Sequence, residues 1–306
     1  MTSNTGIPVT VVLRSYNDAA LLPRTLAALD SQRGVIISLI VYESASTDQS
    51  PALLKAHGYA AIEHLPTGSY WSSSVLNAGV SRAQTDFVAF LNSDAVMMGD
   101  TCLRDLAGAL IAEPRCAGTF ARQTVRPKAG ICTRLDYDTA FAHRDELGSD
   151  AHDCLSLVCS MIRRAAWEDI HFNEDLSYAE DFVWSQHARQ RGWSTRYVPT
   201  ALAEHSHEYT WNERYRRAFG DAAAMATVAQ HQPSGLVRGM LIPWFTRCVR
   251  DTWRLCRYGS PWSAWRLPLY RWPLQLGAWH GAQAGWAHFR TSGNGGRQPL
   301  VPRTKI

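Results

Sequence analysis

VTVVLRSYND, at residues 9–18, joins a mostly apolar run with three valines to a string of polar side chains. Such a run is typical of a strand buried in a parallel sheet. Further β-rich runs at 35–42, 60–64 and 86–91 alternate with helical patterns along the chain. Alternation at this spacing predicts βαβ units, so we expect an α/β fold with a Rossmann-like, mostly parallel sheet and helices on both faces.

Polar segments follow the first, second and fourth of these runs. Because open sheets bind ligands beyond the carboxyl ends of their strands, a site is expected there. The segments are RSYND at 14–18, ESASTD at 43–48 and NSD at 92–94. Asn17 or Asp18 is also placed to cap the first helix. No G-x-G-x-x-G follows the first run and no G-x-x-x-x-G-K-[ST] occurs, which argues against a dinucleotide-binding Rossmann domain and a P-loop NTPase.

The middle of the chain is less regular. Residues 122–150 are charged and aperiodic, which predicts a long surface loop near the site. Two more strands are expected at 155–162 and 195–198, the second ending at Pro199, followed by a long helix at about 211–229.

Composition narrows the class of protein. With 306 residues, 46% hydrophobic and 19% charged, the chain suits one large or two small globular domains. No uncharged apolar stretch reaches the length of about 18 residues that suggests a membrane span, and the N-terminus does not resemble a secretory signal. The seven cysteines are scattered without a C-x-x-C pair, so we expect reduced thiols in a cytosolic protein and no zinc site.

Charge divides the chain into two regions. Residues 1–235 carry 20 Lys and Arg against 26 Asp and Glu, whereas residues 236–306 carry 11 against Asp251 alone. Seven of the twelve tryptophans also fall in this second region, the tail. Two regions with different partners are therefore expected, with a boundary at 235/236.

The tail shows helical periodicity interrupted by prolines. Tryptophans recur every seven residues from Trp265 to Trp286, but Pro261, Pro268 and Pro273 predict two or three short helices. Glycines at 277, 281 and 285 allow close approach of another helix.

Two interpretations of the tail stay open. Tryptophan with arginine suits a membrane interface, where rings lie at headgroup level and guanidinium groups meet anionic lipid. The alternative is a helical hairpin packed on the rest of the chain. Nucleic-acid binding is not expected.

Five segments in order resemble family 2 glycosyltransferases of the GT-A fold. They are VTVVLRSYND (9–18), LIVYESASTD (39–48), SSVLNAGVSRAQTDFVAFLNSD (73–94), FNEDLSYAEDFVWSQHARQRGW (172–193) and VPTALAEHSHEYTWNERYRRAF (198–219). The likeness covers residues 7 to about 230 and is greatest to bacterial O-antigen and capsule rhamnosyltransferases. It implies that residues 1–235 form a catalytic domain that binds a nucleotide sugar, with 236–306 as a helical C-terminal extension.

The resemblance implies a divalent metal site. An acid after the fourth strand holds Mg²⁺ or Mn²⁺ in the family, and here that position is Asp94, with His205 and especially His207 as further contacts. The family's usual Asp-x-Asp is here Asn92-Ser93-Asp94, which keeps one carboxylate, and a hard divalent ion requires at least one. From the residues alone, Asp94 is equally well a turn aspartate, and paired histidines are more often structural.

A second acidic site is Glu180-Asp181, in the first turn of a predicted helix. The helix dipole alone favours carboxylates there. Sugar transfer, however, requires a base that removes the proton of the acceptor hydroxyl. By resemblance, Asp181 is that base and Glu180 orients the acceptor.

Contacts to the nucleotide sugar are implied at the strand ends. Glu43 stands where the family's first acid contacts the nucleobase, and Asn92 can hydrogen-bond a ribose or a phosphate-bound water. The expected set is Arg14, Asn17, Glu43, Asn77, Asn92 and Ser93.

The function implied is inverting transfer of L-rhamnose from dTDP-L-rhamnose to a hydroxyl of a growing bacterial surface glycan. The acceptor would be lipid-linked, so the protein would be cytoplasmic and peripheral at the inner membrane face. A UDP-hexose-dependent enzyme of the same fold is an alternative. Glu43 and Asn92 also leave open a non-catalytic scaffold that binds sugar nucleotides. Nucleotidyl transfer is disfavoured because SYND is not a Gly-rich basic loop.

Overall fold

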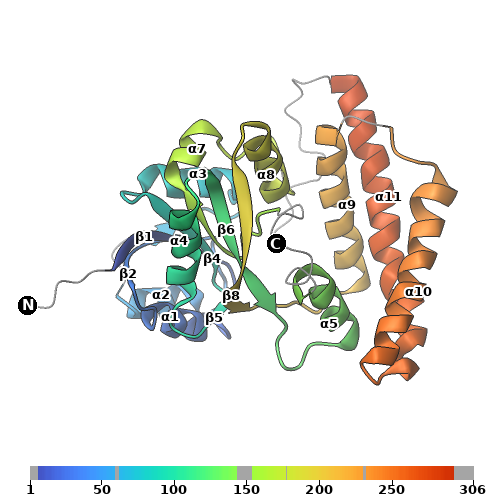
Figure 1. Ribbon diagram of the computed structural model, residues 1–306, viewed down its shortest axis with the longest axis horizontal. Coiled ribbons are helices and arrows are strands. Elements are labelled where there is room, and N and C mark those ends of the chain that lie inside the picture. Colours follow the sequence, from blue (N-terminus) through green and yellow to red (C-terminus); the bar gives the residue numbers. More distant parts are fainter. Residues whose placement is uncertain (1–5, 59–61, 143–153, 177, 230–231, 293–306) are drawn as a thin grey trace, which may run out of the picture.

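The structure is a computed structural model that describes residues 6–58, 62–142, 154–176, 178–229 and 232–292 (Figure 1). Within these residues, eight strands form one sheet, and a bundle of helices stands beside it (Figure 1). The strands are β1 Ile7–Ser15, β2 Val35–Glu43, β3 Ile62–His64, β4 Phe87–Asn92, β5 Val96–Met98, β6 Cys116–Thr124, β7 Cys159–Arg163 and β8 Ser194–Glu204.

The order of the strands brings the polar segments together. It is β3-β2-β1-β4-β7-β6-β8-β5, with β1 parallel to β2 and β4, and β7 antiparallel between β4 and β6. Ser15 is aligned with Glu43, and Arg14 with Asn92. The ends of these three strands therefore meet at one edge, and the predicted α/β, mostly parallel sheet is confirmed.

Helices cover both faces of the sheet because side chains alternate along its strands. Val9, Val11 and Leu13 point into one apolar core, and Val12 into the other. A Cβ added at Gly79 would lie 2.8 Å from two methyl carbons of Val12, so this glycine allows its helix to lie close to β1. The first core is covered by α1 Leu22–Asp30, α2 Ser50–Ala56 and α4 Cys102–Ala112, the second by α3 Ser72–Arg82, α7 Arg164–Asp169 and α8 Glu180–Gln190.

The bundle contains α9 Trp211–Ala229, η2 Val237–Leu241, α10 Ile242–Arg257, η3 Pro261–Arg266 and α11 Leu267–Ser292, with α5 Ile131–Tyr137 and η1 Asp138–Ala142 between bundle and sheet (Figure 1). Gly277, Gly281 and Gly285 of α11 face the backbone of α9 so closely that a Cβ would overlap its carbonyl oxygens. The predicted close helix–helix approach is confirmed.

The prediction that prolines divide the tail into short helices is wrong for α11. This helix runs for 26 residues through Pro273. Pro268 lies in its first turn, where the missing N–H has no intrahelical partner to lose. An interior proline costs roughly 3 kcal/mol, and we attribute its tolerance to the packing of α11 along α9.

The expected cap of the first helix is also wrong. α1 begins at Leu22, after Leu21, and no side chain caps it. Asp18 contributes its backbone carbonyl instead, which accepts hydrogen bonds from the N–H groups of Leu21 and Leu22. The side chains of Asn17 and Asp18 are thus left for the strand-end loops.

Three boundaries in the middle of the chain differ from the predictions. Residues 122–150 are not one loop, because β6 runs to Thr124 and helical residues occupy 131–142; residues 143–153 lie outside the described residues. β8 continues past Pro199 because a register shift against β6 leaves the proline out of the ladder. β7 begins only at Cys159. None of the seven cysteines forms a disulfide, and among the described residues no helix is long and apolar enough to span a membrane.

Candidate active site

Asp94 lies two residues beyond β4, in a loop that its neighbours fix. The N–H of Ser93 donates to the Arg14 carbonyl over 2.9 Å, and its carbonyl accepts from Thr25 Oγ1 over 2.7 Å. The buried Ser93 hydroxyl donates to the Asp18 carboxylate. Ser93 therefore holds the loop, and Asp94 is the residue that the loop presents.

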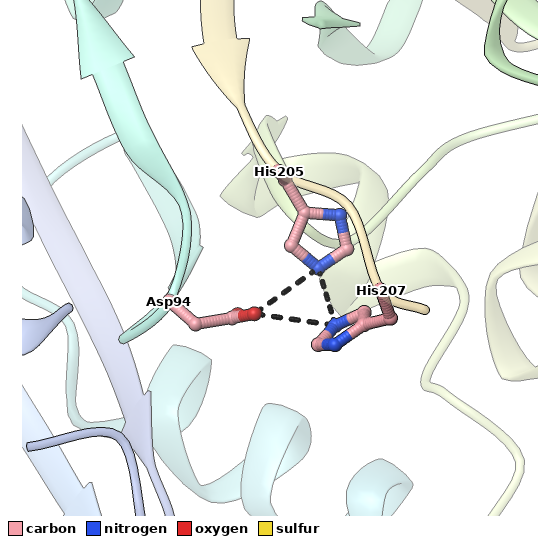
Figure 2. A group of neighbouring side chains, drawn as sticks. All are labelled: Asp94, His205 and His207. Atoms are coloured by element: carbon pink, nitrogen blue, oxygen red, sulfur yellow. Dashed lines mark hydrogen bonds and ion pairs between the residues drawn. The ribbon is translucent and has the colours of Figure 1, made fainter. Parts of the chain in front are cut away.

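Asp94, His205 and His207 form a group of three facing ligand atoms (Figure 2). His207 Nε2 lies 3.2 Å and His205 Nε2 3.6 Å from Asp94 Oδ2, and the two nitrogens lie 3.0 Å apart. Cis ligands on an octahedral ion with bonds of about 2.1 Å are about 3.0 Å apart. The donor set and its spacing therefore fit a divalent cation.

The partners of Nδ1 fix the tautomer of His205. Its Nδ1 lies 3.0 Å from Gln123 Oε1, an acceptor, so this nitrogen carries the proton and Nε2 presents its lone pair to Asp94. Tyr137 Oη lies 3.2 Å from the same Nδ1. Burial lowers the pKa of His205 to about 4 and lowers that of His207 as well. Both rings are therefore neutral at physiological pH, as metal ligation requires.

Arg126, in the loop after β6, is bound to the same carboxylate. Its Nη2 donates to Asp94 Oδ2 over 3.1 Å and to the Asp94 carbonyl over 2.7 Å, while Nη1 donates to the Ser206 carbonyl. The guanidinium thus balances the Asp94 charge in this structure.

The loops after β1 and β2 are tied to each other. Asn17, at φ 53°, accepts a hydrogen bond from the N–H of Thr47 over 2.8 Å, and Asp48 accepts one from the N–H of Ala19 over 2.9 Å. Glu43 is buried. Although burial raises its pKa, hydrogen bonds from Ser46 and His64 outweigh that effect and hold the pKa below its ordinary value. Asn17 and Glu43 thereby shape the rim of the strand-end site.

A chain of hydrogen bonds joins this edge to the second acidic site. Arg14 Nη2 donates to Asn92 Oδ1 over 2.6 Å, and Nη1 donates to Ser72 Oγ over 3.3 Å. The Ser72 hydroxyl in turn donates to Glu180. Residues from β1, β4, α3 and α8 thus form one polar network.

Three carboxylates gather at the start of α8. Desolvation and the nearby charges of Glu180 and Asp221 raise the pKa of Asp181 to about 7. Desolvation also raises the pKa of Asp221, on α9, to about 6, against the lowering effect of Arg217. Ala179, just before the helix, has the left-handed φ of 57°. A carboxylate with a pKa near neutrality is suited to accept a proton.

All hydrogen-bonding groups of the Asn77 amide have partners within the chain. Its Oδ1 accepts from Trp167 Nε1 and the Phe172 N–H, and its Nδ2 donates to the Phe172 carbonyl and to Glu174. The amide is used within the chain, where it holds α3 against the segment that leads to α8.

Sequence reasoning missed several groups near the site. Asp18 could have been found, since it ends the first polar segment. Burial raises its pKa to about 6, the Asp94 charge adds to the rise, and the Ser93 hydrogen bond opposes it. Arg126 and Tyr137 come from the segment predicted to be a loop, and Asp221 comes from the middle of a helix. That segment was predicted to lie near the site, but the sequence singled out neither Arg126 nor Tyr137 and gave no signal for Asp221.

Comparisons with known proteins agree with this geometry. The model of glycosyl transferase family 2 matches residues 10–170. The O-antigen chain rhamnosyltransferase RfbN of Salmonella typhimurium is 24% identical over 221 residues, which cover 69% of this chain and 70% of that protein. The pre-mycofactocin glycosyltransferase of Mycobacterium tuberculosis is 28% identical over 258 residues, 79% of this chain and 53% of that protein.

Solved structures share the fold. The mannosyltransferase PcManGT from Pyrobaculum calidifontis, in complex with GDP-Man and Mn²⁺, superposes with a TM-score of 0.59 at 17% identity, over 94% of this chain and 76% of that one. Glucosyl-3-phosphoglycerate synthase from Mycobacterium tuberculosis gives 0.55 at 19% identity, over 72% and 78% of the two chains.

Proposed function

The chain belongs to glycosyl transferase family 2, and from that premise we propose that it transfers L-rhamnose from dTDP-L-rhamnose to a hydroxyl of a growing bacterial surface glycan. Likeness to O-antigen chain rhamnosyltransferases supports this donor and acceptor class. The observation that carries the proposal is the presence, at one edge of the sheet, of a group at Asp94 that could hold a cation and of an Asp181 carboxylate of near-neutral pKa. Hydrogen bonds through Arg14 and Ser72 link their neighbours Asn92 and Glu180.

The strand-end edge is the proposed donor site. Asp94, His205 and His207 would hold Mg²⁺ or Mn²⁺, which when bound supplies positive charge to the leaving diphosphate. Arg126 adds a second positive charge beside Asp94. Arg14 and Asn92 would contact the nucleotide sugar, and Asn17 and Glu43 would form the rim around the nucleotide. Ser93 would support the loop that carries Asp94. Asn77 is left out because its amide is already used.

Asp181 is the proposed base. The acceptor oxygen forms a bond to the anomeric carbon while the bond from that carbon to the diphosphate breaks on the opposite side. Asp181 takes the hydroxyl proton, and the nucleoside diphosphate leaves with the electron pair. One displacement inverts the anomeric configuration. Glu180, which accepts the Ser72 hydrogen bond, would orient the acceptor.

The proposed acceptor is lipid-linked, so the reaction would take place at the cytoplasmic face of the inner membrane. The Trp- and Arg-rich composition of the tail supports a peripheral contact there.

The donor is tested by thermal unfolding with dTDP-rhamnose, UDP-glucose and GDP-mannose, each with Mn²⁺ and with EDTA. A ligand at a hundred times its Kd adds about 2.7 kcal/mol of stability, so the true donor should raise the Tm clearly and only with metal. Asp94→Asn should remove the metal-dependent part. Selective stabilisation by UDP-glucose would favour the UDP-hexose alternative.

The base is tested with Asp181→Asn. We expect transfer to fall about 10²–10⁴-fold while the donor-induced rise in Tm is kept, because the base acts on the acceptor proton. Asp175→Asn, an exposed acid shortly before α8, is the matched control. Transfer within a few-fold of the parent protein would remove Asp181 from the mechanism. The scaffold alternative predicts no donor hydrolysis by any variant, the parent included.

A further inference from the structure

We propose that α10 and η3 form a docking face for a bilayer that contains anionic phospholipid, with α10 lying along the membrane surface. The proposal rests on the proposed function, in which the acceptor is lipid-linked and the protein must reach a membrane. It adds which residues make the contact and how the helix lies. Its observations come from the bundle and do not involve the site.

One stripe of α10 is apolar and exposed. Leu241, Phe245, Val249 and Trp253 recur at four-residue spacing, so they lie on one face of the helix. Phe245, Val249 and Trp253 are 62%, 54% and 56% exposed. Beyond the end of α10, Trp262 and Trp265 of η3 and Leu269 are more exposed still.

This stripe is not the face that packs α10 into the bundle. The packing face carries Asp251 and Leu255, both fully buried, and Trp244, whose ring meets Trp272 of α11 edge to face. α10 is the outermost helix of the bundle, away from the sheet (Figure 1). Its exposed stripe is therefore a second apolar face, which no described element covers.

A row of arginines flanks the apolar stripe. Arg247, Arg250, Arg254 and Arg257 recur at three- and four-residue spacing on α10. Arg257 stacks 3.7 Å over the Trp253 ring, which places charge at the edge of the stripe.

The charge favours lipid over a second copy of the chain. Asp251 is the tail's one acid, and it is buried in ion pairs with Arg271 and with Arg250 of the arginine row. In a two-fold dimer through this face, arginine rows would approach each other, and the tail has no exposed acid to lie between them. A helix with aromatic and aliphatic residues on one side and arginines beside them is suited to lie at a bilayer surface, its rings among the headgroups.

The test is flotation of the full-length protein with two kinds of vesicle, phosphatidylcholine alone and phosphatidylcholine mixed with phosphatidylglycerol. We expect binding to the mixed vesicles that weakens but persists as salt rises. The triple variant Phe245→Gln/Val249→Gln/Trp253→Gln should lose at least about tenfold in partitioning, because it removes apolar surface from the contact. Ile111→Gln, equally exposed on α4, is the matched control and should bind like the parent.

Each outcome decides the proposal. Equal binding by the triple variant and the parent, or no binding of the parent to mixed vesicles at low salt, would overturn it. So would a parent dimer, seen by light scattering, that the triple variant converts to monomers. Donor-induced stabilisation is measured separately without vesicles and should be unchanged in the triple variant. Failure of the docking face is thereby distinguished from failure of the proposed transfer reaction.

Discussion

α10 and α11 come from the same Trp- and Arg-rich tail, but the fold gives them different surroundings. α11 lies along α9, and its glycines face the α9 backbone. Its tryptophans, Trp272, Trp279 and Trp286, are half-buried. α10 touches the bundle with one face and exposes a second apolar face, with Trp253 open to solvent. The packed-hairpin interpretation therefore describes α11, whereas the interfacial one is left for α10 and η3. The composition of the tail indicated which side chains it carries, but not which of its helices is packed and which is exposed.

The buried ion pair between the two helices should have the largest effect on stability. Asp251 Oδ2 accepts a hydrogen bond from Arg271 Nε over 2.7 Å. Arg271 also pairs with Asp136 of α5. Asp251→Ala should cost about 3 kcal/mol, the lower end for a broken buried pair, because Asp136 remains as a partner. Thermal unfolding measures it.

The matched control for this pair is Asp100→Ala. That residue pairs with Arg33 at the surface and should cost no more than about 1 kcal/mol. Equal losses of Tm in the two variants would show that the pair between α10 and α11 contributes no more than a surface contact.

The glycine stripe should come next. Gly281→Ala places a Cβ against the Phe219 carbonyl of α9, a backbone atom that moves only with its helix. We expect a loss of about 1–3 kcal/mol, the range for overpacking. Gly235→Ala, where a Cβ would meet nothing within 4 Å, should leave the Tm unchanged. If both variants unfold alike, α11 does not depend on close approach to α9.

A smaller effect is expected from Asp221 of α9 on the pKa of Asp181. Because Asp181 must be ionised to act as the base, transfer should rise with pH through about 7 and level off above it. The Asp221 charge raises that pKa, so Asp221→Asn should move the acid limb of kcat/KM to lower pH. An acid limb that stays in place would show that α9 does not tune the base.

The outer face of α10 should have the smallest effect on folding. Phe245→Gln/Val249→Gln/Trp253→Gln replaces exposed side chains and should change the free energy of unfolding by no more than about 0.5 kcal/mol. Urea unfolding checks this value. A larger loss would mean that the stripe packs within the folded protein, which would make α10 resemble α11 after all.

Much of the catalytic half could be predicted from the sequence. The strand-end positions of Arg14, Glu43 and Asp94 follow from period-two burial and parallel pairing, which are local rules. The resemblance singled out His205 and His207 as a pair, and in the structure they directly follow β8. The family, the fold and the glycosyltransferase class were all readable from five ordered segments.

Only the tertiary structure decided which side chains meet. Arg126 reaches Asp94 and Asp221 approaches Asp181 from elements far away in the sequence, and no spacing encodes such contacts. Asn77 matched a family position, yet its neighbours use every group of its amide. Pro273 lies inside a helix because packing along α9 outweighs a local penalty. Local sequence patterns determine the type of each element and the side chains it carries. The burial and pKa of those side chains, and the face of a helix that stays exposed, depend on which distant residues pack against them.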